Sequence, residues 1–180
     1  MRFVGLFISV LLAVAFAVST EFESPSTEWN VILEGDPSIS VHVRGIDKVG
    51  QKLPSLYACD GEGRIPTIKW DAVPNAKSYL VIVYDPDAPV GTFYHLVGVV
   101  PTSTTMIDNQ TQWTILGHNS GGKPGWFPLC PPPFDNPHRY YFLVVAMNYV
   151  PKQLPAYEAF PKILKDKVIG WGWTMGTYHR

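Results

Sequence analysis

This 180-residue sequence has few of the features that mark nucleic-acid-binding, metal-binding or membrane-spanning proteins. It carries 14 basic and 15 acidic side chains and no run of Lys or Arg, which argues against a nucleic-acid partner and a polybasic membrane surface. It has only two cysteines and no Cys-x-x-Cys pair, so no cysteine-type metal motif is present. Neither a repeat nor a domain break divides it. The length predicts one domain with a substantial core.

Proline and glycine are plentiful, with 17 and 15 residues, and they imply many turns and little room for long helices. The content of 46% hydrophobic and 16% charged residues is typical of a compact globular protein rather than a disordered chain. The composition therefore favours a β-rich fold.

The N-terminus carries an export signature. Arg2 precedes an apolar run from Phe3 to Val18, and Ala15-Phe16-Ala17 supplies the small-x-small pattern that signal peptidase cleaves. About 16 apolar residues are fewer than the roughly 20 that span a bilayer. We therefore predict a signal peptide at 1–17, with an uncleaved membrane anchor as the alternative. A lead-in segment at 18–38 and a folded domain at 39–180 follow, and the mature chain has 13 basic and 15 acidic side chains.

Export changes the interpretation of the cysteines. In an oxidising compartment Cys59 and Cys130 can form a disulfide, although two separate buried thiols are also compatible with the sequence. Asn109-Gln110-Thr111 is a glycosylation sequon in a polar stretch that we expect on a surface loop. We expect a secreted or otherwise extracytoplasmic protein.

Hydrophobic patterning predicts an all-β fold, a β-sandwich with one or two short helices. The segment 39–44 alternates apolar and polar residues, as in a half-buried strand, whereas 78–84 is continuously apolar, as in a strand buried on both faces. A short amphipathic helix is expected over Tyr157–Val168, with Pro161 at its beginning. The expected strands are 39–44, 67–70, 78–84, 94–100, 138–146 and 169–180.

Polar side chains stand at the ends of three of these strands. Asp85 and Asp87 end one, His95 lies near the start of the next, and His138 opens a third. If the strands are neighbours, these groups converge in one pocket that the surrounding prolines make rigid. Taken singly, Asp-Pro-Asp is usually a turn and a lone histidine is usually a hydrogen-bonded surface residue. Arg139 is expected on the opposite face, as an ion-pair partner of Asp85 or Asp87.

These residues also belong to a larger set of motifs that resembles the phosphatidylethanolamine-binding protein family, in its bacterial and archaeal branch. The resemblance extends from about Ile39 to Arg180 and includes nearly the whole mature chain. The matching segments are Cys59-Asp60-Gly61, Trp70, Asp85-Pro86-Asp87-Ala88-Pro89, His95, Gly122-Lys123-Pro124-Gly125, Cys130-Pro131-Pro132, Pro137-His138-Arg139-Tyr140 and Gly176-Thr177-Tyr178.

The resemblance implies a Greek-key β-sandwich with an anion cavity, no cofactor and no enzymatic turnover. It assigns Asp85, His95 and His138 to the cavity and Tyr140 to its wall, with a hydroxyl that can donate to a ligand. It also assigns Ala88 and Pro89 to the lip, and Cys130, Pro131 and Pro132 to a backbone segment in which the Cys130 N–H faces a phosphate.

The sequence departs from the family's animal members in two ways. Phe93-Tyr94-His95 stands where they have Trp-His-His, and the C-terminal helix that partly covers their cavity has no counterpart. Ile65-Pro66 also replaces the Ser-Pro of many prokaryotic relatives. We therefore expect a more open site.

The expected function is binding of a small anion, a phosphate or a phospholipid headgroup. We expect both His95 and His138 to be partly protonated near neutral pH and Asp85 to orient one of them. The alternative is an extracellular protease inhibitor that acts on a peptidase through loops such as Gly117 to Pro128. A Cys130–His138 hydrolase and a metal site of Asp85, Asp87, His95 and His138 are less favoured, because the sequence shows neither an oxyanion hole nor ligand spacing.

Overall fold

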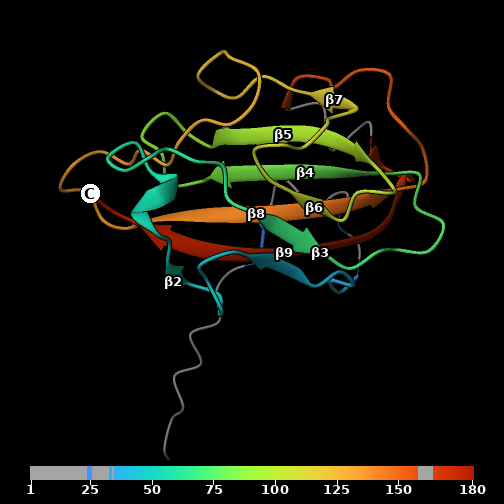
Figure 1. Ribbon diagram of the computed structural model, residues 1–180, viewed down its shortest axis with the longest axis horizontal. Helices are drawn as coiled ribbons and strands as arrows, with labels where there is room; N and C mark the ends of the chain where they lie inside the picture. Colours follow the sequence, from blue (N-terminus) through green and yellow to red (C-terminus); the bar gives the residue numbers. More distant parts are fainter. Residues whose placement is uncertain (1–23, 26–32, 34, 158–163) are drawn as a thin grey trace, which may run out of the picture.

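The structure, a computed structural model, describes residues 24–25, 33, 35–157 and 164–180 and is built on two β-sheets (Figure 1). The larger sheet has the order β2-β9-β8-β4-β5-β7 and the smaller has the order β1-β3-β6. The 3₁₀ helix η1 spans Ser55–Tyr57. The strands are β1 Val41–Val43, β2 Gln51–Lys52, β3 Ile68–Trp70, β4 Ser78–Asp85, β5 Phe93–Pro101, β6 Met106–Ile107, β7 Ile115–Leu116, β8 His138–Met147 and β9 Val168–Tyr178.

The centre of the larger sheet consists of long antiparallel strands rich in β-branched and aromatic residues, which fit a pleated, buried surface. Every residue of β4 is buried, and β4 lies between β5 and β8. β8 pairs on its other side with β9, and β9 in turn pairs with β2, which is parallel to it. The strand 78–84 was predicted to be buried on both faces, and this is confirmed.

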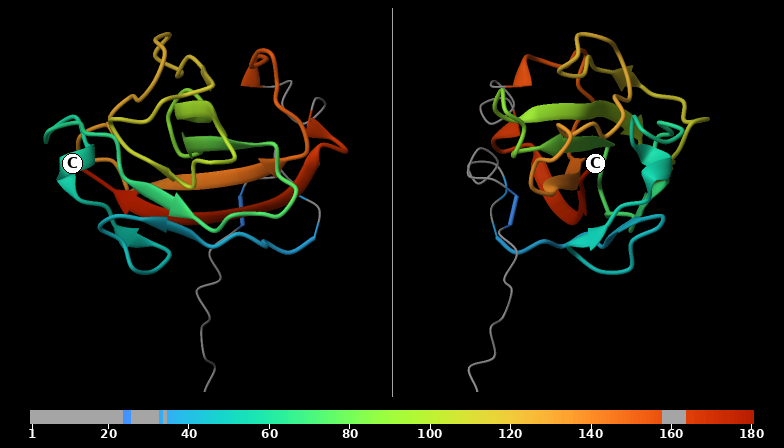
Figure 2. Two further views of the ribbon diagram at one scale, coloured as in Figure 1. Left: turned by 45° about the vertical axis from the view of Figure 1, so that its right-hand side comes forward. Right: turned by 90° about the vertical axis from the view of Figure 1, so that its left-hand side faces the viewer.

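The two sheets form separate layers, which Figure 2 shows from two further directions. Alternate residues of β4 and β8, among them Val81 and Phe142, pack toward β1 and β3 in one apolar cluster. The intervening residues, among them Ile82 and Leu143, belong to a second cluster on the other face. There Leu33, Leu154, Tyr157 and Leu164 cover the sheet. Burying a side chain of this size contributes about 1.5–3 kcal/mol.

The all-β fold predicted from the sequence is confirmed, and all six predicted strands are present with small shifts of their ends. Sequence patterning missed β2, β6 and β7, which have two residues each and so carry no periodicity. The predicted helix end at Val168 is wrong. The chain turns through residues 165–167, where Asp166 has a φ of 64°, and Val168 already begins β9.

Part of the sequence prediction lies outside the described residues. This holds for the signal segment 1–17, most of the lead-in 18–38, and residues 158–163 of the expected helix. Within the described part of the chain, no helix has the length and apolar character needed to cross a membrane.

β4 ends, and β5 and β8 begin, at the same end of the larger sheet, near the C-terminus (Figure 1, left). Asp85 pairs with Phe93 across β4 and β5, and Tyr84 pairs with Tyr141 across β4 and β8. The loop between β4 and β5 begins with a turn in which the Asp87 N–H donates to Asp85 Oδ1 at 2.8 Å. This turn aims the Asp85 side chain across the strand ends rather than into solvent.

Candidate functional site

A buried carboxylate–imidazole pair lies at this end of the larger sheet. His138 Nδ1 is 2.7 Å from Asp85 Oδ2, and both side chains are nearly inaccessible to solvent. Burial raises the pKa of Asp85 above its usual range, and the hydrogen bond and charge of His138 oppose that rise. Asp85 therefore orients His138, one of the two histidines that the sequence offered for this contact.

A second carboxylate reaches the other nitrogen of the same ring. Asp135 Oδ2 is 3.4 Å from His138 Nε2. Burial alone would lower the pKa of His138, but hydrogen bonds and charges from Asp85 and Asp135 outweigh it and raise the pKa above its ordinary value. Carboxylates accept hydrogen bonds at both ring nitrogens, so the imidazolium is the form that satisfies both contacts.

His95 differs from His138 in charge. Its Nδ1 is 2.8 Å from the carbonyl oxygen of Phe127, and the Phe127 N–H donates back to the His95 carbonyl oxygen at 2.8 Å. Burial lowers the pKa of His95 to about 4, against the opposing effect of the Phe127 and Pro128 carbonyls. The expectation that both histidines are partly protonated near neutral pH is therefore wrong for His95, because it lies among aromatic rings without a carboxylate partner.

Tyr140 lies between the two histidines. Its ring centroid is 5.3 Å from that of His95 and 6.5 Å from that of His138. Its hydroxyl is buried and forms no hydrogen bond of normal geometry with the described residues. Burial and the negative charge of Asp85 raise the Tyr140 pKa far above its ordinary value, so the hydroxyl keeps its proton and remains a donor.

Asp87 and Arg139 form a separate ion pair beside the site. Arg139 Nη2 is 2.7 Å from Asp87 Oδ1, and its backbone N–H and Nε both donate to Asp87 Oδ2. Burial would raise the pKa of Asp87, but the hydrogen bonds and charge of Arg139 lower it. Of the two ion-pair partners that the sequence left open for Arg139, the structure selects Asp87. Among the described residues, no group of three or more His, Cys, Asp or Glu is placed to hold a metal ion.

The predicted lip and backbone segment lie in two loops next to this centre. Ala88 is half-buried and Pro89 exposed in the turn after β4. Pro131 is buried, with Pro132 and Cys130 half-buried beside it. No hydrogen bond or ring contact of the described residues joins these five to Asp85, His95, His138 or Tyr140.

A disulfide ties the loop that carries Cys130 to the turn after η1. Cys59 and Cys130 are bonded, with Cα atoms 5.4 Å apart, which resolves the two alternatives of the sequence in favour of a disulfide. The Cys59 N–H donates to the Leu129 carbonyl at 2.9 Å, and Arg180 Nε donates to the Pro131 carbonyl at 2.7 Å. The loop is thus held from both sides.

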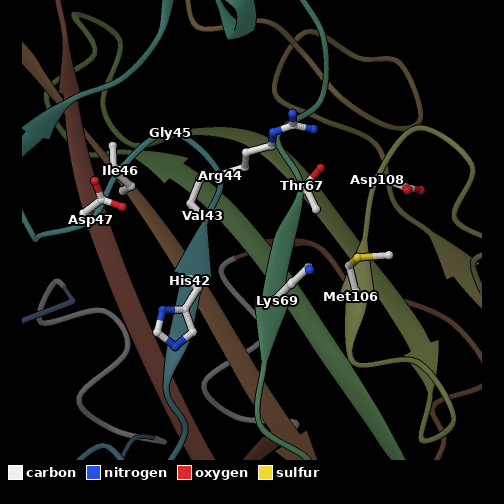
Figure 3. A pocket seen from close by; sticks show the side chains of 10 residues that line it. All are labelled: His42, Val43, Arg44, Gly45, Ile46, Asp47, Thr67, Lys69, Met106 and Asp108. Atoms are coloured by element: carbon white, nitrogen blue, oxygen red, sulfur yellow. The ribbon is translucent and has the colours of Figure 1, made fainter.

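A hollow that the sequence did not predict lies on the outer face of the small sheet, away from Asp85 and His138 (Figure 3). It has a volume of about 700 Å³, and His42, Arg44 and Lys69 line it together with Asp47 and Asp108 at its ends. His42 and Lys69 are register partners across β1 and β3. Because basic and acidic groups both line this hollow, it has no single sign of charge to select a ligand.

The surface loop proposed for protease inhibition is a compact structure. The Asn119 side chain donates to the Gly125 carbonyl at 3.0 Å, and the Asn119 N–H donates to the Lys123 carbonyl at 2.8 Å. Ser120 to Pro124 are exposed at its tip. The loop also supplies Phe127, whose carbonyl sets the orientation of His95. Asn109 of the sequon is exposed in a turn.

Sequence reasoning missed two groups that shape the site. Asp135 belongs to none of the motifs described above, although its position three residues before His138 is compatible with a local contact. The Phe127 carbonyl could not have been found, because a backbone atom 32 residues from His95 leaves no mark in the sequence.

Comparison with known proteins agrees with this architecture. Residues 46–179 match the family model described as phosphatidylethanolamine-binding protein. A UPF0098 protein of Aquifex aeolicus is 32% identical over 144 residues, which cover 74% of this chain and 84% of that protein. A Mycobacterium tuberculosis protein named as lipoprotein LppC is 34% identical over 111 residues, covering 57% of this chain and 54% of that protein.

A solved structure agrees as well. The crystal structure of a phosphatidylethanolamine-binding protein homologue from Chlamydia trachomatis superposes with a TM-score of 0.71 at 27% identity and covers 81% of this chain and 99% of that one. The family match spans well over half of the chain, and the Aquifex aeolicus relative aligns with 144 of its residues. The chain therefore belongs to the phosphatidylethanolamine-binding protein family.

Proposed function

We propose that this protein is an extracytoplasmic, non-enzymatic binding protein that takes a small phosphate-type anion at the Asp85–His138 centre. The observation that carries the proposal is the buried His138 ring, whose position between two carboxylates favours its charged form. A charged donor inside a protein is a strong ligand for an anion, since charge-assisted hydrogen bonds are roughly twice as strong as neutral ones. The Tyr140 hydroxyl is buried near the Asp85 carboxylate, forms no hydrogen bond of normal geometry with the described residues, and supplies a second donor.

The Asp135 carboxylate occupies the place where an anion would meet His138. Its loop is exposed from Pro133 to Pro137, and Phe134 has a φ of 67°, a conformation that residues other than glycine adopt at some cost. Since the histidines and Tyr140 are covered in this structure, we infer that an incoming anion displaces Asp135 and takes over its hydrogen bond from His138 Nε2.

The extracytoplasmic location rests on two supports. The Cys59–Cys130 disulfide is of a kind that persists mainly in oxidising compartments. The mycobacterial relative carries the name of a lipoprotein, which is a class of exported protein. The N-terminal signal segment expected from the sequence agrees with both.

Replacing His138 with alanine is expected to weaken phosphate binding about 10- to 100-fold, because a charged hydrogen-bond donor is worth roughly 1.5–3 kcal/mol. Isothermal titration calorimetry with inorganic phosphate at pH 6 measures this. In the wild type, affinity should fall as pH rises through the raised pKa of His138, since the ring then loses its charge.

The matched control is His42→Ala, which removes an exposed histidine from the hollow of Figure 3. It should leave phosphate affinity unchanged. Equal affinities of the wild type and His138→Ala would overturn the proposed site, and a loss of binding confined to His42→Ala would assign the anion to the hollow instead.

Replacing Asp135 with asparagine is expected to tighten phosphate binding about tenfold at pH 5.5. The substitution removes a charge that competes for His138 Nε2, while Asp85 still keeps the ring protonated at this pH. Asp71→Asn removes the same charge from an exposed position after β3, remote from the site, and should change nothing. Weaker binding by Asp135→Asn would show instead that Asp135 supports the ligand.

A further inference from the structure

His95 presents a hydrogen-bond acceptor to the site, not a second cationic donor. A carbonyl oxygen can only accept, so the 2.8 Å contact with the Phe127 oxygen places the ring proton on Nδ1. The paired hydrogen bond from the Phe127 N–H to the His95 carbonyl holds the two residues together. With the ring neutral, Nε2 therefore carries a lone pair.

This lone pair has no partner among the described residues. The His95 side chain is only 3% exposed, and its Nε2 is one of the few buried polar atoms of the described chain that form no hydrogen bond. The Tyr140 hydroxyl is another, and the two rings are edge to face at 5.3 Å. Such atoms are costly to bury unpaired, and these two do not bond to each other although their rings are in contact, so they indicate a ligand with complementary groups.

At this end of the larger sheet, the side chains thus provide two hydrogen-bond donors and one acceptor. His138 Nε2 and the Tyr140 hydroxyl donate, while His95 Nε2 accepts. A fully ionised anion such as sulfate has only acceptor oxygens and would place one of them against the His95 lone pair. An anion that keeps a proton can donate that proton to Nε2 and accept from the other two groups.

We propose that this site selects anions that carry a P–O–H group, namely hydrogen phosphate and phosphomonoesters. It discriminates against sulfate and phosphodiesters, because they have no O–H group that can donate a hydrogen bond to His95 Nε2. The inference rests on the anion site proposed above and narrows its ligand class. Free phosphate and the headgroup of a phosphomonoester lipid share this chemistry, whereas the phosphodiester of most phospholipids has no P–O–H hydrogen.

The test compares two ligands of equal charge. At about pH 5, below the second pKa of a phosphomonoester (about 6), methyl phosphate is mostly a monoanion with one hydroxyl and dimethyl phosphate is a monoanion with none. Calorimetric titration of the full chain should show methyl phosphate binding about tenfold more tightly, because at this pH dimethyl phosphate can bind only if His95 is first protonated, which costs about one pKa unit. Phosphate should exceed sulfate by a similar factor. A short-chain phosphatidic acid distinguishes a lipid headgroup from the free ion.

His95→Gln supplies the matched variant. A glutamine amide lies near the Nε2 position and can turn either its oxygen or its NH₂ toward the ligand, so the two monoanions should bind within about threefold of each other. If this variant does not fold, two measurements on the wild type still test the inference. One is the comparison of methyl phosphate with dimethyl phosphate, and the other is the protonation state of His95 Nε2 from its ¹⁵N chemical shift. A protonated Nε2 in the free protein, or equal binding of both ligands by the wild type, overturns this inference alone. If the wild type binds none of these anions, the proposed function fails with it.

Discussion

Asp85→Asn is expected to discharge His138 near neutral pH and to weaken phosphate binding about 100-fold. Asparagine keeps the size of the side chain and can still accept from His138 Nδ1, but it removes the charge that opposes the desolvation of the imidazolium. Among the described residues, only the Asp135 carboxylate then remains in contact with the ring, and we expect burial to lower the pKa of His138. Titration of the His138 ring protons by NMR in both proteins measures the change directly.

The same substitution should alter how stability depends on pH. In the wild type the pKa of His138 is higher in the folded than in the unfolded state, so its stabilisation is complete below about pH 6.5 and is lost as pH rises through the folded pKa. In Asp85→Asn the folded pKa lies below the unfolded value, so stability should rise with pH through that lower window. We expect the variant to be about 3 kcal/mol less stable at pH 6, because a buried pair has lost the charge of one partner.

Urea unfolding at a series of pH values between 5 and 8 tests whether the slope of the unfolding free energy against pH changes sign between the two proteins. Asp71→Asn, an exposed aspartate, provides the reference for a simple loss of negative charge. Parallel pH profiles for the wild type and Asp85→Asn would contradict the assignment of a charged His138.

Removing the disulfide is expected to lower the free energy of unfolding by about 4 kcal/mol and the melting temperature by about 10 °C. The size of the effect comes from the 71-residue separation between Cys59 and Cys130, because a long closed loop restricts the unfolded chain strongly. The loop encloses β3 to β7, which include two strands of the small sheet and the central β4–β5 hairpin. The measurement is denaturant unfolding of the oxidised wild type against the Cys59→Ser/Cys130→Ser double variant.

Other contacts should keep the double variant folded. The Tyr178 hydroxyl donates to Asp60 Oδ1 at 2.7 Å, next to Cys59, and Arg180 contacts the Pro131 carbonyl. Reduced wild-type protein should match the double variant, which separates loss of the cross-link from effects of the serines. A loss of stability below about 1 kcal/mol would mean that these contacts already hold the loop without the bond.

The core of the fold could be predicted because its signals are local. The runs 79–84 and 140–147 are continuously apolar, Asp85-Pro86 ends the first and Pro137-His138-Arg139 precedes the second, so both the strands and their polar ends follow from the local order of residues. The short strands β6 and β7 could not be predicted, since they form because longer neighbours offer them a free edge. Two residues each are too few for a detectable preference for β-strand.

The candidate site shows the same division. The positions of Asp85 and His138 followed from strand ends, and their pairing follows from the register of β4 and β8. The difference in charge between His95 and His138 could not be read from the sequence. It depends on which groups surround each ring after folding, a backbone carbonyl in one case and two carboxylates in the other.

The place of β9 governs when this protein can fold during synthesis. β9 contains the last strand residues of the chain, yet it lies inside the larger sheet between β2 and β8 and pairs with β8 over ten residue pairs. The backbone groups of β8 on that side, and those of β2 from much earlier in the chain, therefore have no strand partner until β9 has been synthesised. A nascent chain can form the β4–β5 hairpin early. The sheet cannot close before β9 emerges, and until then β8 exposes a long unpaired strand edge of the kind that promotes pairing between chains.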